Sequence, residues 1–500
     1  MGGTIKKMTS PRSKDAKPQL AEAKPKAKEY DCIVIGGGIG GLTAAAKLAL
    51  MGKSVVLVEK KNRLPSGCMS LYVSPKGDAE WPLGVHFVGG QVMNTQSGFG
   101  QLVNETTGGK VTFTKMPPHV IMRPDKSRQP FPDKWSTLVM ALEHQFKDSA
   151  ADIEAFDKYL HECFELEMKR LNFAEAPPTY STETYAESLD KFNIKHPLLR
   201  EALSVQCAIA ALTAQAASTA LLSFSAEYYR EDTAFPVGGP AAWANAIKDT
   251  VTANKGEIKL GASVSKVIVE GGKTAGVTLA DGSVLRGKTV VSCIGAHTTY
   301  CELVDPVIPA LQEARDSLLA NNPPMSTSAF MLCVTLKPGE YPKEFFFHME
   351  PMKPPVYVSF MSARDPTWKD RYPDVMSCEI TTRQVAEEWI GLAPEAVEAT
   401  VQAVMAYLLG VFELHFPEAH ANIVDKYPLS PLKMQEELGS FHGSMYGVAQ
   451  VPARVNKPFL MVTTALEGLY LGGQDMFCPN LYGASLGGVA AANAAAAKLG

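Results

Sequence analysis

The most constraining feature of the sequence is a strand–loop–helix–strand unit near its beginning. Residues 31–35 read as a short buried strand and run directly into a glycine-rich loop, residues 36–41. Residues 42–51 are good helix formers with apolar side chains at helical spacing, and a second apolar strand, residues 54–58, ends on Glu59. This order predicts a Rossmann-type unit that binds a dinucleotide at the helix N-terminus.

The residues of this loop have separate physical tasks. Gly36 permits a tight turn, Gly38 lets the backbone approach a pyrophosphate, and Gly41 allows the helix to pack closely on the strand. Glu59 is placed to accept hydrogen bonds from a ribose diol. A glycine turn without a ligand is the alternative, but the strand, the helix and the acid at the expected spacing favour a bound dinucleotide. The predicted contacts are Gly36, Gly38, Ile39, Gly40, Gly41 and Glu59.

This unit by itself does not distinguish FAD from NAD, because both cofactors present the same ADP half. The end of the chain carries a second signal. Residues 468–475 read as a strand that ends in a turn and an acid, and residues 483–488 open an alanine-rich final helix.

Taken together, these motifs resemble the carotenoid isomerase and retinol saturase branch of the phytoene desaturase-like flavoproteins, over most of residues 30 to 500. The matching segments are residues 36–41 with Glu59, 66–68, 84–89, 235–239, 290–295 and 473–475. The resemblance implies an FAD-dependent oxidoreductase. No histidine or cysteine stands in a known attachment motif, so we expect noncovalent FAD. No second GxGxxG unit is present for a nicotinamide cofactor, so electrons would come from outside, from free NAD(P)H or a quinone.

The resemblance also implies roles for single residues. Asp475 resembles the acid that holds the ribityl chain, and Val264 the position whose backbone contacts the adenine. A helix end near the flavin ring favours negative charge there. The family usually has two glycines near the pyrophosphate after Glu59, and this chain has Pro65-Ser66-Gly67 instead. The remaining implied cofactor contacts are Ser66, Gly67, Gly295, Gly473, Gly483, Ala484 and Ser485.

One residue is a candidate for catalysis. His86 matches the Gly-x-His segment of the family, which we expect close to the flavin and the substrate. A loop histidine that only ties backbone together is the alternative interpretation. No metal site is expected, because the nine cysteines show neither metal-ligand nor paired spacing.

The predicted fold class is α/β, a Rossmann-type FAD-binding domain of the GR2/amine-oxidase-like kind with an inserted α+β substrate domain. We expect a discontinuous FAD-binding domain from residues 30–125, 225–330 and 440–500. The substrate domain is expected from residues 126–224 and 331–438. Residues 1–29 are a basic segment, rich in Lys, Ala and Pro, that is predicted to be a disordered tail. A remnant of an organelle-targeting peptide and a weak anchor to anionic lipid are the alternatives.

Composition limits the cellular setting. A net charge of −4 with 20% charged residues gives no indication of nucleic-acid binding. Unpaired cysteines favour reduced thiols in an intracellular compartment, and a plastid or endomembrane surface fits the family. Residues 202–226 carry no charge until Glu227, but their serines, threonines and glutamines predict a buried helix rather than a membrane span. Peripheral membrane contact is expected, because a polyene must be taken from lipid.

Three functions remain open from the sequence. The first is an enzyme that isomerises or saturates double bonds of a hydrophobic polyene, such as a carotenoid, a retinoid or a polyunsaturated lipid. The second is a flavin-dependent amine or porphyrinogen oxidase. The third is a non-catalytic lipid-escort protein of the same fold, which the intact glycines and Asp475 disfavour.

Overall fold

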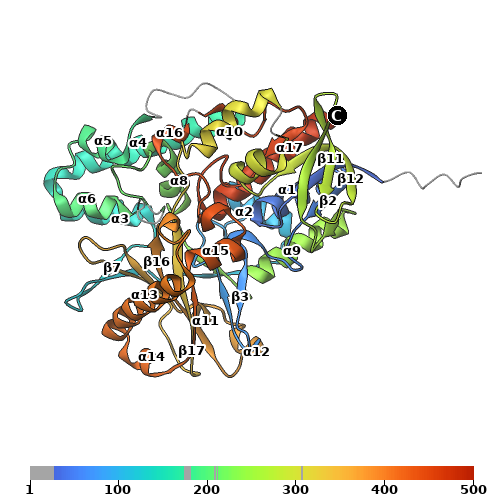
Figure 1. Ribbon diagram of the computed structural model, residues 1–500. Coiled ribbons are helices and arrows are strands. Elements are labelled where there is room, and N and C mark those ends of the chain that lie inside the picture. Colours follow the sequence, from blue (N-terminus) through green and yellow to red (C-terminus); the bar gives the residue numbers. More distant parts are fainter. Residues whose placement is uncertain are drawn as a thin grey trace, which may run out of the picture.

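Two seven-stranded sheets organise the chain, and the computed structural model describes residues 28–173, 182–205, 207, 210, 212–305, 308–455 and 457–500. The expected basic tail lies outside the described residues, except for its last two positions. Figure 1 shows the first sheet at the upper right beside α1 and α17, and the second sheet below it beside α13.

The first sheet contains the predicted dinucleotide unit. The strand β1 (Glu29–Ile35) pairs in parallel with β2 (Val55–Val58) on one side and with β12 (Val284–Ser292) on the other. The strand β9 (Glu257–Lys259) extends the β2 side, and β18 (Leu469–Leu471) also pairs in parallel with β12. The helix α1 (Ile39–Leu50) connects β1 to β2, which confirms the predicted order, although it begins three residues earlier than expected.

An antiparallel meander completes this sheet. The strands β10 (Val264–Glu270) and β11 (Lys273–Leu279) lie next to β12, and the turn at residues 280–283 joins β11 to β12 as the Asp-Gly-Ser sequence predicts. The long helix α17 (Asn480–Leu499) packs against α1, and α9 (Gly239–Ala253) covers the other side of α1. The Rossmann-type architecture is therefore confirmed.

The second sheet is mixed and draws on distant parts of the chain. Its strand order is β17, β13, β16, β15, β14, β6, β7, and only β6 and β14 are parallel to each other. The strands are β6 (His119–Met122), β7 (Arg128–Phe131), β13 (Ser328–Leu336), β14 (Phe345–His348), β15 (Val356–Ser359), β16 (Met376–Gln384) and β17 (Ile423–Leu429). The strand β6 falls inside the range expected for the FAD-binding domain, so the sheet begins before residue 126. The division into domains stays a prediction.

Short elements connect the two sheets. Two small antiparallel sheets pair β3 (Leu71–Val73) with β4 (Glu80–Pro82), and β5 (Phe113–Lys115) with β8 (Ala234–Pro236). The remaining helices of four or more residues, apart from a π-helix at Thr298–Leu303, are α2 (Gly98–Thr107), α3 (Trp135–Gln145), α4 (Ala150–Phe173), α5 (Tyr185–Lys191), α6 (Pro197–Leu203), α8 (Thr219–Tyr228), α10 (Gln312–Leu319), α11 (Met361–Arg364), α12 (Trp368–Arg371), α13 (Pro394–His415), α14 (Pro417–Ala421), α15 (Pro431–Leu438) and α16 (Pro452–Val455).

The expectation of one buried helix over residues 202–226 is wrong. The helix α6 ends at Leu203, and a new helix, α8, begins at Thr219. The physical reason is a polar cap, because the Ser218 side chain accepts a hydrogen bond from Leu221 N and starts the second helix there. The α8 half is buried, as expected, and packs against α4.

Candidate functional site

A cavity of about 280 Å³ lies at the carboxyl ends of the parallel strands of the first sheet. This position is where open α/β sheets bind their ligands. The predicted cofactor contacts that line it are Gly36, Gly38, Ile39, Gly40, Glu59, Ser66, Gly67, Val264, Gly295, Gly473, Asp475 and Ala484.

Three of the predicted cofactor contacts, Gly41, Gly483 and Ser485, are not among the residues that line this cavity. A Cβ on Gly41 would lie 1.9 Å from Gly36 O, so Gly41 serves close packing, as its position in the motif predicts. A Cβ on Gly483 would lie 2.0 Å from Cys478 O, which gives this glycine a packing role as well. Ser485 is buried within α17.

The N-terminus of α1 opens on this cavity. Its N-cap is Gly38, no side chain caps the helix, and its first turn carries no acid. A Cβ added to Gly38 would meet nothing nearer than Ser66 O at 3.7 Å, so open space lies in front of the glycine. Unpaired N–H groups beside such a space fit the phosphates of a dinucleotide.

Glu59 is fixed in the wall of the cavity. Its Oε2 accepts hydrogen bonds from Gly37 N at 2.6 Å and from Ser66 Oγ at 2.8 Å, and its Oε1 accepts one from Lys61 N at 2.7 Å. The residues that replace the two glycines of the family therefore have a visible role, since Ser66 holds the acid and lines the cavity. Val264, the first residue of β10, lines the same cavity.

Asp475 is almost fully buried and joins two loops. Its Oδ1 accepts a hydrogen bond from Val448 N at 2.9 Å, and its Oδ2 accepts one from Ala296 N at 2.8 Å. The final helix begins at Asn480, three residues before the expected Gly483, because Asn480 Oδ1 accepts hydrogen bonds from the N–H groups of Tyr482 and Gly483. The start of α17 lies close to the cavity, but its first N–H groups are partly capped from within.

Some lining residues had no recognisable sequence signal. His297 and Phe441 stack with ring centroids 3.5 Å apart in the wall of the cavity. Burial lowers the pKa of His297, with a smaller contribution from His442. These residues belong to segments that only the tertiary structure brings together, so no motif could have indicated them.

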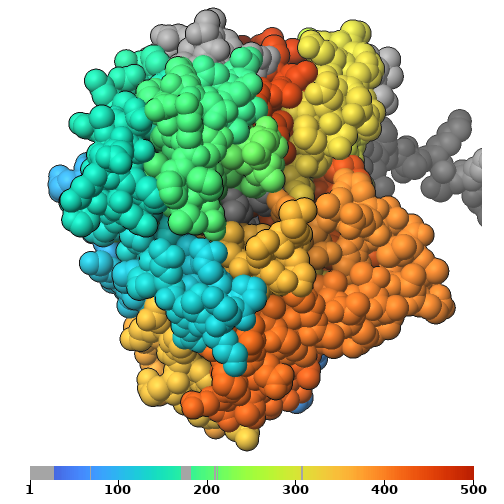
Figure 2. All heavy atoms as spheres, turned by 90° about the vertical axis from the view of Figure 1, so that its left-hand side faces the viewer, coloured from blue at the N-terminus to red at the C-terminus, as the bar shows by residue number. Residues whose placement is uncertain are grey.

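A second cavity adjoins the first and is predominantly apolar. Its volume is about 140 Å³, and Leu438, Met445 and Gln474 line both cavities. Aromatic and aliphatic side chains form most of its wall: Leu83, Phe87, Tyr228, Tyr229, Met331, Phe345, Phe347, Tyr357 and Leu481. Figure 2 shows a hollow on this face of the molecule, between the green helical segments and the orange segments of the second half of the chain.

His86 lines this second cavity, as predicted for a residue near the substrate. Its ring lies 5.1 Å from the Phe345 ring, and its Nε2 is 3.4 Å from Glu379 Oε1. Burial, with a contribution from Arg364, lowers the pKa of His86 to about 3. A neutral imidazole therefore faces the cavity at physiological pH.

The charge pattern of the second cavity is one-sided. Among the described residues that line it, Arg383 is the charged side chain, and no aspartate or glutamate is present. A cationic substrate would gain no opposite charge from this lining. The wall suits an uncharged apolar chain.

The residues of the first cavity fit FAD. The open space before Gly38, the uncapped helix and the acid at each end of the cavity match the phosphates and hydroxyl groups of the cofactor. The neighbouring apolar cavity gives a second compartment that meets the first at Gln474 and Met445. The geometry therefore combines a dinucleotide site with a separate apolar site.

Comparisons with known proteins agree with this geometry. Residues 39–496 match the family described as flavin containing amine oxidoreductase. The chain is 24% identical to all-trans-retinol 13,14-reductase of Rattus norvegicus, over 93% of this chain and 86% of that protein. It is 26% identical to the chloroplastic prolycopene isomerase of Daucus carota, over 95% of this chain and 81% of that protein. A solved structure of putrescine oxidase bound to putrescine has a TM-score of 0.63 and 14% identity, with 94% of this chain and 99% of that chain covered.

Proposed function

Since the chain belongs to the family of flavin containing amine oxidoreductases, we propose that it uses FAD to act on double bonds of a hydrophobic polyene. The reaction is either cis–trans isomerisation or saturation. The observation that carries the proposal is the apolar cavity beside the cofactor cavity, because an extended conjugated chain needs such a wall. The similarity to a retinol reductase and a prolycopene isomerase supports the same substrate class.

Bound FAD supplies two-electron redox chemistry in this arrangement. The chain's own residues do the rest. Gly36, Gly38 and the start of α1 bind the phosphates, and Glu59 and Asp475 bind the hydroxyl groups of the cofactor. The aromatic wall of the second cavity excludes water and orients the polyene. His86 stands in that wall as one of the polar groups that can meet the substrate.

The lining favours a polyene over an amine. An amine substrate is a cation in neutral solution, and this cavity presents Arg383 and no carboxylate among its described lining residues. A porphyrinogen, with its carboxylate groups, would find only this one arginine. A lipid escort would not need the cofactor contacts that line the first cavity.

The function is tested by product analysis. The enzyme is incubated anaerobically with photoreduced FAD and a cis-carotenoid, a retinoid or a polyunsaturated fatty acid. Products of unchanged mass identify an isomerase, and a gain of two hydrogens identifies a saturase. Turnover of an amine or a porphyrinogen with release of peroxide, while every polyene stays intact, would overturn the proposal.

A pair of variants separates the two cavities. Ala329→Phe adds bulk to the wall of the second cavity and should slow turnover of polyenes while the FAD content stays unchanged. Ala396→Phe makes the same change on the exposed side of α13 and serves as the control. Equal loss of activity in both variants would contradict the assignment of the second cavity to the substrate.

We further propose peripheral membrane contact, through which an apolar substrate enters from lipid. One helix among the described residues, α13, is long and apolar enough to cross a membrane, with a mean hydropathy of 1.4 over its most apolar window. It packs on the second sheet through Val401, Leu408 and Phe412, while only 17% of that window is buried. The packed side favours a surface position over a span, and a plastid or endomembrane surface fits the two relatives.

Liposome flotation tests this contact. The protein should float with vesicles, and carbonate or high salt should release it. Ala403→Glu, on the exposed side of α13, should weaken flotation without changing FAD content. Release by detergent alone would contradict peripheral contact.

A further inference from the structure

A buried acid stands directly behind the wall of the second cavity. Glu379 lies on β16 with its side chain fully buried. Thr381 Oγ1 donates a hydrogen bond of 2.7 Å to Glu379 Oε1, and His86 Nε2 lies 3.4 Å from the same oxygen. Both neighbours line the cavity. The acid therefore touches the cavity only through His86 and Thr381.

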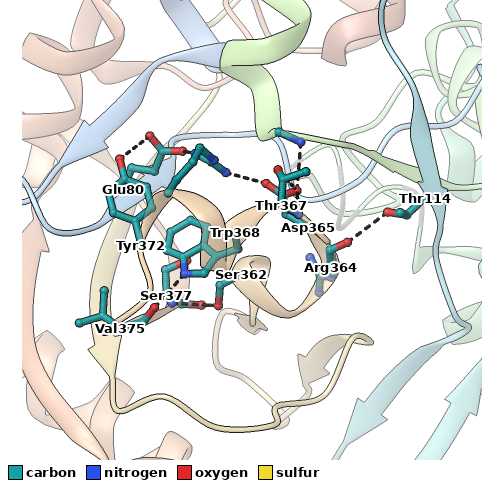
Figure 3. A network of polar contacts seen from close by, with 12 residues as sticks. Glu80, Thr114, Ser362, Arg364, Asp365, Thr367, Trp368, Tyr372, Val375 and Ser377 are labelled. Carbon is teal, nitrogen blue, oxygen red and sulfur yellow. Dashed lines mark hydrogen bonds and ion pairs between the residues drawn. The ribbon is translucent and has the colours of Figure 1, made fainter.

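The nearest cation is fully engaged with neutral groups. The Arg364 guanidinium donates hydrogen bonds to the carbonyl oxygens of His86, Lys343 and Glu344 and to Ser359 Oγ, at distances from 2.6 to 3.0 Å. Figure 3 shows how its loop is held, since Thr114 Oγ1 donates to Arg364 O and the neighbouring Asp365 accepts several hydrogen bonds. Arg364 is thus fixed in place without forming an ion pair with Glu379.

Two polar atoms of this cluster have no hydrogen-bond partner among the described residues. They are Glu379 Oε2 and His86 Nδ1, and both are buried. Buried polar atoms cost folding free energy unless water or a ligand pairs with them, and these two lie in or directly behind the wall of the second cavity. The other ionisable groups that influence the cluster are Arg364, His119, Cys333 and Cys378.

At neutral pH, Glu379 and His86 together hold one proton in addition to the N–H proton of the neutral imidazole. Burial raises the pKa of Glu379 to about 8, against the opposing effects of the Thr381 hydrogen bond and Arg364. The lowered pKa of His86 keeps its imidazole neutral. The proton therefore resides on the carboxyl group, and a group with a pKa near the working pH is suited to general acid catalysis.

We propose that Glu379 stores the proton which His86 delivers to the polyene bound in the second cavity. This inference rests on the proposed function and adds to it the source of the proton. His86 touches the substrate, and Glu379 acts through His86. In this step the Glu379 O–H bond breaks as an Nε2–H bond forms on His86, while the Nδ1–H bond of the same ring breaks as a C–H bond forms on the chain, so the imidazole stays neutral.

The electrons and atoms of the reaction balance. In saturation, the pair contributes one hydrogen as a proton, and FAD bound in the first cavity, recharged by an external two-electron donor, would supply the two electrons and the other hydrogen. The Glu379 carboxylate left behind takes its proton back from solvent. In isomerisation, the π electron pair forms the new C–H bond, and the same proton returns to the pair after bond rotation, so no net reductant is consumed.

Infrared titration of the FAD-loaded protein tests the stored proton independently of turnover. Wild-type protein should show a protonated carboxyl band that disappears as the pH rises through about 8. Glu379→Gln should lack this band, and Glu344→Gln, which changes a carboxyl group outside the pair, should keep it. Absence of the band in wild type, or its survival in Glu379→Gln, would overturn the proposal.

Turnover in D₂O tests the delivery. Glu379→Gln should lower kcat by roughly 10²- to 10⁴-fold with little change in KM, and should abolish the fall in activity above about pH 8. Glu379→Asp should recover part of the rate and restore this pH dependence. Deuterium should enter the wild-type product, as one solvent-derived hydrogen in a saturated product.

The outcomes distinguish the two proposals. If wild-type protein leaves every polyene unchanged, the proposed function and this inference both fail. If wild-type protein turns over a polyene while Glu379→Gln keeps its rate, its pH profile and its deuterium content, the inference alone fails.

Discussion

Replacing Gly38 by valine should leave the chain folded and remove FAD binding. The backbone at Gly38 has φ −70° and ψ 175°, a conformation that every L residue adopts. A Cβ there lies 3.7 Å from its nearest neighbour, Ser66 O, so the new side chain enters the open space in front of α1. That space is where the pyrophosphate is expected.

The size of the effect follows from the contacts that the phosphates lose. Displacement from the helix N-terminus removes about two charge-assisted hydrogen bonds, each worth about 1.5–3 kcal/mol. The loss of about 3–6 kcal/mol corresponds to a roughly 10²- to 10⁴-fold rise in the Kd for FAD. Loss of a glycine N-cap costs folding about 1 kcal/mol, which a protein of this size tolerates.

The assay combines FAD content with thermal unfolding. Wild-type protein should purify yellow and release FAD on heating, whereas Gly38→Val should purify colourless with a cooperative melt. Gly410→Ala is the control, because this exposed glycine of α13 has no atom within 4 Å of a built Cβ, and alanine should stabilise the helix by about 0.5–1 kcal/mol. A Gly38→Val protein that binds FAD within tenfold of the wild-type Kd would refute the reasoning.

Three further changes test the packing around the site. Gly488→Ala places a Cβ 2.2 Å from Gly40 O, so it should separate α17 from α1 and lower stability by more than about 2 kcal/mol in urea unfolding; an unchanged midpoint would contradict this. Arg371→Met leaves the mostly buried carboxylates of Glu80 and Asp365, both labelled in Figure 3, without their shared cation. The free energy of unfolding should fall by about 3–5 kcal/mol, measured as a fall in Tm. Burial and its His348 neighbour lower the pKa of His415 to about 4, so the unfolded chain binds the proton more readily and stability should fall as the pH drops from about 6.5 towards 4. In urea unfolding at several pH values, His415→Gln should flatten that fall, and an equally steep loss in the variant would exclude this histidine as its cause.

The dinucleotide unit was readable because its signals are local. Each of β1, α1 and β2 depends on side chains that are neighbours in the sequence, and the motif constrains its own backbone through Gly36 and Gly41. The hairpin at residues 280–283 was predictable for the same reason. His86 could be assigned to the substrate cavity only through the family resemblance.

The predicted helix bounds were wrong where one local sequence pattern is compatible with two different helix arrangements. An uncharged stretch at residues 202–226 permits one helix or two, and the Ser218 cap decides for two. The final helix gains three residues because Asn480 supplies its own cap. The cofactor contacts expected at Gly483 and Ser485 depended on where this helix begins, and the structure places both residues outside the lining of the first cavity.

The sequence by itself determined that this chain builds a dinucleotide site, since strand, glycine loop, helix and acid interact over short separations along the chain. Only the tertiary structure decided what stands beside that site. Glu379 occurs in a strand whose alternation reads as ordinary, and its raised pKa comes from burial among β13, β15 and β16, which outweighs the opposing effect of Arg364. Desolvation depends on every atom packed around a group, and those atoms come from segments far apart in the sequence, so no local pattern encodes it.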